Sequence, residues 1–263
     1  TSIRHSPAEH IARRGTGLRG WSVSWIIGHA AMDRQDSPRI GRLWRWPRLQ
    51  ALHALLRRTL IPSERALHRL RTRRREELLQ PWPVTAPDRH PALFALAAER
   101  LAGLAEPRIL SFGCSTGEEP LTLARYLPQA RIDGLDINPR NVAEARRKVA
   151  KAGLQRIAIA EAGTPPVETE RYDVVFCLSV LRHGELDAYR PDTCTQILPF
   201  RRFAETVSAL DRVVKPGGLL FLWGCNFRFA DTDEASRYEV IPVPPMPPQD
   251  GPFYGPDDRR LPI

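Results

Sequence analysis

The feature that most constrains the fold is an alternation that begins at residue 108. Short runs rich in β-branched and aromatic residues alternate there with longer stretches of helical apolar spacing. Such runs, separated by helices of about ten residues or more, are typical of βαβ units with parallel strands. The expected strands are 108–112, 131–137, 156–160, 172–178, 218–224 and a last one at 237–243. The expected helices between them are 117–127, 139–152 and about 198–214. The sequence therefore predicts an α/β protein.

The regions on either side differ in composition. Residues 1–80 hold 17 of the 39 Lys and Arg residues but only 6 of the 30 acidic residues. Apolar spacing predicts helices from Pro47 to Leu60 and over 64–79. The arginines of the second helix form either a solvated face or a docking surface for an acidic partner. The proline-rich stretch 81–91 indicates a linker, with Asp88 expected to cap the next helix. We predict three regions: a basic, mainly helical segment 1–87, the α/β domain 88–243, and an irregular proline-rich tail 244–263.

Several functional classes are disfavoured by what the chain lacks. No apolar run approaches the roughly 18 residues that span a bilayer, and no basic stretch with a cleavage site marks a signal peptide. We therefore expect a cytoplasmic protein without membrane contact. The four cysteines show neither CxxC pairing nor zinc-like spacing to histidine, so we expect them to pack in the interior and predict no metal site.

The loop after the first strand of this sheet reads GCSTGEE and covers residues 113–119. It lacks the second glycine of the dinucleotide fingerprint and the Lys-Ser/Thr pair of a P-loop. Glu118 and Glu119 fall in the first turn of the next helix, where they neutralise its partial positive charge and repel phosphate. This loop is therefore not expected to bind a nucleotide phosphate. Either glutamate can instead simply complement the helix dipole.

A second acidic residue follows the next strand. Asp136 ends the run GLDI about twenty residues after the loop, where a carboxylate accepts hydrogen bonds from ribose hydroxyls. Its alternative role is to cap the helix that opens at Pro139. A ribose, no phosphate and a cationic group held by carboxylate together describe S-adenosylmethionine (SAM). The sequence thus predicts SAM as cofactor, with one of the two loop glutamates contacting its ammonium group.

Four stretches resemble the CheR-type methyltransferases, which methylate glutamate side chains of chemoreceptors. FGCSTGEEPLTLARYL and GLDINPRNVAEAR are similar to the first and second motifs of that family, and YDVVFCLSVL and LDRVVKPGGLLFLWG to its later strands. The resemblance covers about residues 106–243. It implies a Rossmann-like class I methyltransferase fold with a seven-stranded, mostly parallel sheet that contains one antiparallel strand.

The resemblance also implies a set of cofactor-binding residues. The first loop would contact the methionine part, the GLDIN stretch the ribose, Glu161 and Ala162 the adenine, and Leu178 and Ser179 the region beneath the methyl group. These residues are Gly113, Cys114, Ser115, Thr116, Gly117, Glu118, Glu119, Asp136, Ile137, Asn138, Glu161, Ala162, Leu178 and Ser179.

The likeness does not extend to the methyl acceptor. The family's Asn-Val pair and aromatics after the fourth strand are replaced by SVLRHGELDAY, and we find no counterpart of its receptor-binding β-subdomain. A carboxylate acceptor is already ionised at neutral pH and needs no base. A hydroxyl or amine acceptor benefits from one, and His183 is the best-placed candidate, with Tyr189 and Asp187 behind it. The alternative for His183 is a helix-capping or surface histidine.

The sequence therefore favours a SAM-dependent methyltransferase that modifies a carboxylate or hydroxyl oxygen of a small-molecule or peptide acceptor, possibly an acidic one. A chemotaxis-type protein-glutamate methyltransferase, an RNA methyltransferase and a non-catalytic SAM-binding module stay open as alternatives. Nucleic acid is disfavoured as a substrate because the Asn/Asp-Pro-Pro-aromatic pattern of base methylation is missing after the fourth strand. The glycine spacing disfavours a nicotinamide oxidoreductase, and nothing in the sequence indicates an oligomeric state.

Overall fold

The computed structural model describes residues 61–82, 84–243 and 251–262. The helix predicted from Pro47 to Leu60 lies outside this part of the chain. The described elements run in the order α3 (Pro62–Arg73), α4 (Pro91–Arg100), β1 (Arg108–Phe112), α5 (Glu118–Tyr126), β2 (Arg131–Asp136), α6 (Pro139–Ala152), β3 (Ile157–Glu161), β4 (Tyr172–Leu178), α7 (Gly184–Tyr189), α8 (Phe200–Val213) and β5 (Val214–Trp223). Two 3-10 turns, Phe229–Asp231 and Asp233–Arg237, follow.

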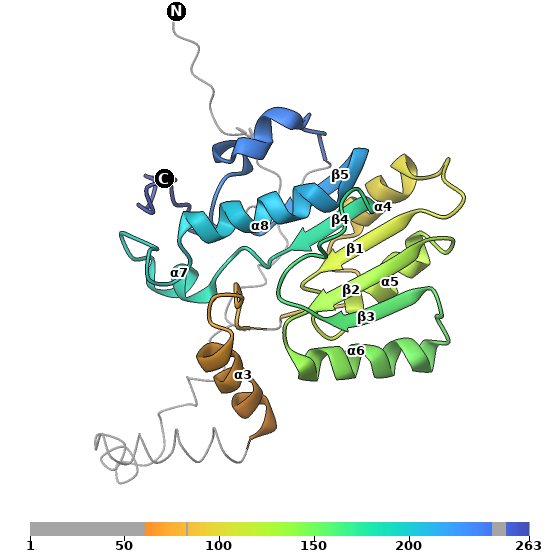
Figure 1. Cartoon of the computed structure of the whole chain (residues 1–263), viewed down its shortest axis with the longest axis horizontal. Coiled ribbons are helices and arrows are strands. Elements are labelled where there is room, and N and C mark those ends of the chain that lie inside the picture. The colour runs from red at the N-terminus through yellow and green to blue at the C-terminus, as the bar shows by residue number, and fades with distance from the viewer. Residues whose placement is uncertain (1–60, 83, 244–250, 263) are drawn as a thin grey trace, which may run out of the picture. The chain divides into compact units, whose positions relative to one another are not determined.

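The five strands form one sheet in the order β3-β2-β1-β4-β5, and every neighbouring pair is parallel (Figure 1). The prediction of a Rossmann-like α/β fold is confirmed, but the sheet of the described residues has five strands and not the seven that the resemblance implied. The strand predicted at 237–243 was wrong, because Tyr238–Val243 has no regular structure and the described residues contain no antiparallel sheet strand. Pro242 has no backbone N–H to donate to a neighbouring strand, and Val240 is 85% exposed rather than buried as in a sheet.

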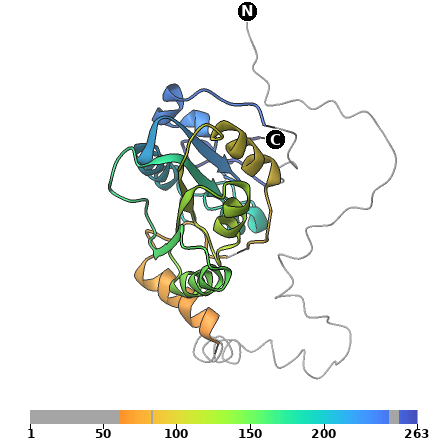
Figure 2. The same cartoon turned by 90° about the vertical axis from the view of Figure 1, so that its right-hand side faces the viewer.

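Helices cover both faces of the sheet, as a right-handed crossover between parallel strands requires. The apolar sides of α4, α5 and α6 pack on one face, against sheet residues such as Ile109 and Phe176. The apolar side of α8 packs on the other face, against residues such as Val175 and Cys177. Figure 2 shows α4 and α5 on one side of the sheet and α8 on the other. Two interior layers thus hold the strands rigidly, which fixes the loops at their ends.

The helix ends differ from the prediction in ways that matter for the site. Asp88 does not cap α4: its backbone has φ +50°, and its carboxylate accepts a hydrogen bond from the Tyr126 hydroxyl. His90 is the N-cap residue of α4, and its side chain makes no capping bond. Asn138 caps α6 by accepting from the backbone N–H of Arg140. Asp136 is therefore not the cap of that helix.

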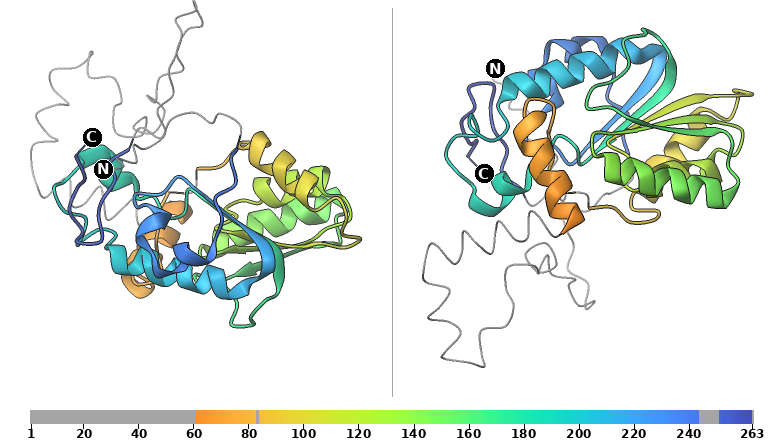
Figure 3. Two further views of the ribbon diagram at one scale, coloured as in Figure 1. Left: turned by 90° about the horizontal axis from the view of Figure 1, so that it is seen from above. Right: turned by 60° about the horizontal axis from the view of Figure 1, so that its bottom comes forward.

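Two segments predicted as simple connections are packed on the domain. Helix α3, orange in Figure 3, ends at Arg73 rather than near residue 79. The chain that follows it contacts the loop after β4, where Gln80 donates to the backbone oxygen of Arg182. Residues 251–262, predicted to be irregular, form two isolated bridges, and Tyr254 within them is fully buried. Within the described residues, we find no helix with the length and apolar character that crossing a membrane requires.

Candidate functional site

The candidate site lies where the strand order reverses. Strands β2 and β4 flank β1, and the chain leaves β1 and β4 in opposite directions. In open parallel sheets, ligands bind outside the carboxyl ends of the strands at this point. A pocket with an empty volume of about 690 Å³, open to solvent, occurs there. Its lining from the sheet side is Phe112, Gly113, Ser115, Asp136, Ile137, Asn138, Asn141, Ala162, Gly163, Leu178, Ser179 and Val180.

Asp136 organises the sheet side of this pocket. Its carboxylate accepts hydrogen bonds from the backbone N–H of Ser115 (2.9 Å), the backbone N–H of Asn138 (2.8 Å) and the side-chain amide of Asn141 (3.1 Å). Burial raises the pKa of Asp136, although these three donors act in the opposite direction. A carboxylate has about four acceptor positions, so one is left for a ligand.

The backbone of the loops around the pocket adopts unusual conformations. Gly113 (φ +77°) and Gly117 (φ +90°) use the left-handed region that glycine tolerates. A side chain at Gly113 would begin 2.2 Å from Val180, so the loop needs glycine there. Ser115 (φ +49°) and Ser179 (φ +62°) occupy the same region without being glycine. Such strain at non-glycine residues is concentrated at functional sites.

A smaller hollow, with an empty volume of about 390 Å³, adjoins the pocket and shares Gly113, Ser115 and Leu178 with it. Glu119 lines this hollow and accepts a hydrogen bond from the Ser111 hydroxyl at 2.7 Å. Burial raises the pKa of Glu119 to about 7, with the Ser111 bond and the charge of Arg89 opposing the shift. Arg89 also lines the hollow, and its Nη2 lies 3.1 Å from the Ser179 hydroxyl.

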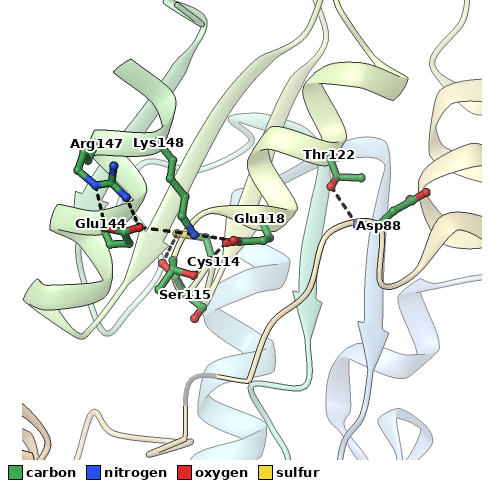
Figure 4. Close-up of polar contacts among 9 residues, drawn as sticks. Asp88, Cys114, Ser115, Glu118, Thr122, Glu144, Arg147 and Lys148 are labelled. Carbon is green, nitrogen blue, oxygen red and sulfur yellow. Dashed lines mark hydrogen bonds and ion pairs between the residues drawn. The ribbon is translucent and has the colours of Figure 1, made fainter. Parts of the chain in front are cut away.

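Glu118 lines neither cavity. Its carboxylate is 2.5 Å from the Lys148 ammonium on α6 and accepts a hydrogen bond from the Thr116 hydroxyl. Figure 4 shows Glu118 and Lys148 reaching toward each other beside Glu144, which in turn pairs with Arg147. The two adjacent glutamates thus have separate surroundings, because successive helix positions face about 100° apart.

The predicted cofactor residues divide into two groups. Ten of them line the pocket or the hollow: Gly113, Cys114, Ser115, Glu119, Asp136, Ile137, Asn138, Ala162, Leu178 and Ser179. Thr116, Gly117, Glu118 and Glu161 do not. Gly117 is the N-cap of α5, where an added side chain would begin 2.9 Å from Ala145. The Glu161 carboxylate forms an ion pair with Arg74 at 3.0 Å.

The two predicted catalytic residues do not line the pocket. His183 is the N-cap of α7, and its Nδ1 accepts from the backbone N–H of Glu185. It is buried, and burial lowers the pKa of its imidazole to about 4. This arrangement corresponds to the capping alternative. Tyr189 ends the same helix with 78% of the residue exposed.

Sequence reasoning missed the wall of the pocket that comes from the segment after α3. We call residues 74–82 and Val84 the strap. Seven strap residues line the pocket: Glu77, Leu78, Leu79, Gln80, Pro81, Trp82 and Val84. Arg202 of α8 donates to the backbone oxygens of Glu76 and Leu78, and Gln80 donates to the backbone oxygen of Arg182. The predicted linker is therefore a fastened part of the site.

Trp82 anchors the far end of the strap. Its ring packs edge-on against the His183 imidazole with 5.4 Å between centroids, and the Arg71 guanidinium lies 5.5 Å from the ring centroid. The absence of a side chain at Gly184 makes room for this ring, because an added Cβ would lie 3.0 Å from it. The proline content of the stretch suggested a linker, whereas the only sign of packing was its single tryptophan.

The cavities fit the two halves of SAM. Ile137, Ala162 and Leu178 give the larger pocket an apolar surface suited to a purine ring, and Asp136 keeps an acceptor for a ribose hydroxyl. Glu119 gives the hollow a carboxyl group that could pair with an ammonium. The Ser115 hydroxyl and His90 Nε2 are buried there without a hydrogen-bond partner among the described residues. The cofactor supplies an electrophilic methyl group, and these residues would hold it.

Comparison with known proteins agrees with this geometry. Residues 110–222 match the family model for a methyltransferase domain. The ubiquinone biosynthesis O-methyltransferase of Methylocella silvestris is 34% identical over 117 residues, which cover 43% of this chain and 38% of that protein. The "Probable biofilm formation methyltransferase WspC" of Pseudomonas putida is 44% identical over 78 residues, 26% of this chain and 18% of that protein.

Among solved structures, a SAM-dependent methyltransferase from Geobacter sulfurreducens in complex with S-adenosyl-L-homocysteine is 24% identical, with a TM-score of 0.37, over 52% of this chain and 47% of that one. The chain spans at most 38% of the length of the two curated relatives above. The family match lies on the sheet and loops that form the pocket. Residues 110–222, which carry the sheet and the loops of the pocket, are therefore similar to a methyltransferase domain.

Proposed function

We propose that the protein transfers a methyl group from SAM to an oxygen of a carboxylate or hydroxyl on a small-molecule or peptide acceptor, and that a carboxylate is the preferred group. The observation that carries this preference is the position of Arg89. Its guanidinium bonds to Ser179 at the carboxyl end of β4 and to the backbone oxygen of Val84 in the strap. None of the ion pairs among the described residues includes Arg89; its charge acts on the nearby Glu119 carboxyl and can also meet an anion in the adjoining space.

The surroundings of the predicted bases support the same preference. His183 uses Nδ1 as a helix cap and has a pKa of about 4, and Tyr189 faces solvent. Neither is placed to remove a proton from a hydroxyl acceptor in the pocket. A carboxylate needs no such step, since it is ionised at neutral pH. The rate then depends on holding the acceptor oxygen, the methyl carbon and the sulfur in line, with SAM leaving as S-adenosylhomocysteine.

The acceptor carboxylate can belong to a free acid or to a glutamate side chain in a protein. A glutamate side chain is favoured by two similarities. The chain is 44% identical over 78 residues to the biofilm formation methyltransferase, and residues 106–243 carry the CheR-type motifs. The strap walls one side of the pocket. An acceptor that enters beside the strap would contact Trp82 and Val84, which suits a slender acid or an extended side chain.

The test is transfer of a labelled methyl group from SAM to a panel of small acids, glutamate-containing peptides, hydroxyl analogues and RNA. A carboxyl methyl ester releases volatile labelled methanol in mild alkali, whereas an ether, an N-methyl group or a methylated base does not. We expect alkali-labile label on an acid or peptide. Alkali-stable label on a hydroxyl analogue or RNA would overturn the carboxylate preference.

Arg89→Gln examines the residue that carries the proposal. Loss of one charge-assisted hydrogen bond should lower kcat/KM for the acceptor by about ten- to a hundredfold, with S-adenosylhomocysteine affinity retained. Arg100→Gln is the matched control, because Arg100 is exposed at the end of α4 away from the pocket. A fall in cofactor affinity with unchanged acceptor kinetics would instead place Arg89 with the cofactor.

A further inference from the structure

Two large apolar residues at the end of the strap stay exposed although they line the pocket. Trp82 is 38% exposed and Val84 is 58% exposed. Trp82 lines the pocket, and Val84 lines both the pocket and the hollow. Contact between apolar side chains and water is unfavourable. Neighbouring apolar residues that stay exposed at the wall of a cavity are typical of a surface that a ligand covers.

The fold holds these two residues in place. The backbone N–H of Val84 donates to the backbone oxygen of Trp82 at 3.0 Å, which closes a tight turn between them. The Trp82 ring contacts the His183 imidazole and the Arg71 guanidinium. Arg71 is itself engaged in an ion pair with Glu185 at 3.8 Å. With these partners present, the strap end keeps a fixed apolar surface in contact with solvent.

The polar groups of this end of the strap already have partners. The backbone N–H of Trp82 donates to the side-chain oxygen of Gln80 at 3.3 Å, and the Gln80 amide donates to the backbone oxygen of Arg182. The backbone oxygen of Trp82 accepts from Val84, and that of Val84 accepts from Arg89 at 2.9 Å. An extended peptide binds by pairing its main chain with N–H and C=O groups of its partner. The strap end is therefore better suited to apolar contact than to a peptide backbone.

A cation adjoins this apolar surface. The Arg89 guanidinium links the strap to the sheet, because Nη1 donates to the Val84 backbone oxygen and Nη2 to the Ser179 hydroxyl at 3.1 Å. Its charge also acts on the Glu119 carboxyl group in the hollow. A guanidinium has more N–H groups than these two hydrogen bonds use, so others can meet a carboxylate. An anion that binds Arg89 therefore has the apolar strap end as its neighbour.

We propose that the methyl acceptor is a free carboxylic acid with an apolar chain or ring next to its carboxyl group. Arg89 binds the carboxylate, and Trp82 and Val84 cover the apolar part. This inference rests on the proposed function and specifies its acceptor. The CheR-type motifs lie in residues 106–243 and the family match in 110–222, so neither includes the strap or Arg89. The likeness to glutamate methyltransferases thus does not extend to this wall of the pocket.

The test compares hexanoate with 5-oxohexanoate, which has the same chain with a polar carbonyl in place of one methylene. Label from SAM that alkali releases measures methylation of either acid. We expect kcat/KM to be about ten- to a hundredfold higher for hexanoate, because the carbonyl loses its hydrogen bonds to water against an apolar wall. A short peptide with apolar residues on both sides of a glutamate should have a lower kcat/KM than hexanoate.

Two variants locate the preference between the acids. Val84→Thr exchanges one methyl for a hydroxyl, and it should lower the ratio of the two kcat/KM values by about fourfold, the value of burying one such group. Trp82→Ala should bring the ratio close to one. The ratio is insensitive to altered cofactor binding, since both acids react with the same cofactor. Val167→Thr is the matched control, because Val167 is 95% exposed and lines neither cavity, and it should leave the ratio unchanged.

The outcomes separate this inference from the proposed function. Equal kcat/KM for the two acids, or a preference that survives in both variants, would overturn the inference alone if the label is alkali-labile. Faster methylation of the peptide than of hexanoate would also overturn it, in favour of a protein side chain. No alkali-labile label on any acid or peptide would overturn the proposed function and this inference together.

Discussion

At the residue scale, the two adjacent glutamates of the first loop show that the position of a side chain on a helix decides what it contacts. Glu118 pairs with the half-buried Lys148 of α6, whereas Glu119 is enclosed beside the sheet and has a pKa of about 7. Only Glu119 faces a cavity that can take a ligand. Both glutamates occur in the first turn of α5, so the sequence alone could not separate them.

The raised pKa of Glu119 predicts a pH dependence of stability. The folded protein favours the protonated carboxyl, so this group destabilises the fold progressively as pH rises from 4.5, its ordinary value, through about 7. Glu119→Gln should remove that trend and become more stable than wild type toward the upper end of the range. Urea unfolding across this range measures the difference. A constant difference between the two proteins would contradict the burial of the Glu119 charge.

Asp136 has a structural task as well as a ligand-facing position, which changes what its removal should do. Asp136→Ala leaves the donors of Ser115, Asn138 and Asn141 unsatisfied, so we expect a loss of about 1–3 kcal/mol in the free energy of unfolding. Affinity for SAM or S-adenosylhomocysteine should also fall by about 1–3 kcal/mol. Calorimetry and urea unfolding give the two values.

The matched control is Asp133→Ala in the same strand. Asp133 accepts from the Tyr172 hydroxyl and pairs with Arg171, and it does not line the pocket. This substitution should lower stability without changing cofactor affinity. If Asp136→Ala behaves in the same way, with affinity retained, Asp136 supports the loop and does not contact the ribose.

At the scale of elements, the strap packs so closely on the domain that a glycine beside it has no space for a side chain. A Cβ at Gly163 would lie 2.9 Å from the Cβ of Glu77 and 2.7 Å from its carboxylate. Gly163→Ala should therefore push the strap off the end of β3, at a cost of about 1–3 kcal/mol. We expect faster trypsin cleavage at Arg73–Arg75 and weaker binding of S-adenosylhomocysteine.

Gly103→Ala is the control for this prediction, because no atom lies within 4 Å of the added Cβ. It should leave the cleavage rate unchanged and can stabilise slightly by restricting the unfolded chain. Equal cleavage rates for the two variants would show that the strap does not depend on the space at Gly163.

The elements also show which parts of the structure local sequence could predict. Strands β1 and β4 match their predicted bounds, because apolar runs between turns report burial within a parallel sheet directly. The strap could not be predicted, since its fastening depends on partners such as Arg202 and Glu161 that are far away in the sequence. His90 and Arg89 were also missed as residues that line the hollow, because their neighbours in space are distant in the sequence. The strand predicted at 237–243 failed because alternation alone cannot show whether a neighbouring strand is available.

At the scale of the whole molecule, the described domain is completed by residues distant from the methyltransferase motifs. Tyr254 is fully buried beside Phe227, and its hydroxyl donates to the backbone oxygen of Pro191 at 3.0 Å. Its backbone N–H donates to the backbone oxygen of Asn226, whose own side chain accepts from the N–H of His183. Residues 251–262 thus support the loop that leads into α7. This loop ends at His183, whose ring contacts Trp82.

The last prediction follows from these contacts of Tyr254 with the rest of the domain. Tyr254→Ala should lower the free energy of unfolding by about 3–5 kcal/mol, because it removes a fully buried aromatic ring and leaves a cavity. Tyr189→Ala is the matched control, and it should change stability by less than about 0.5 kcal/mol since Tyr189 is mostly exposed. Urea unfolding of both variants measures the contrast. A small effect at Tyr254 would mean that residues 251–262 rest on the domain without stabilising it, and the loop from Leu181 to His183 would then depend on α7 and the strap alone.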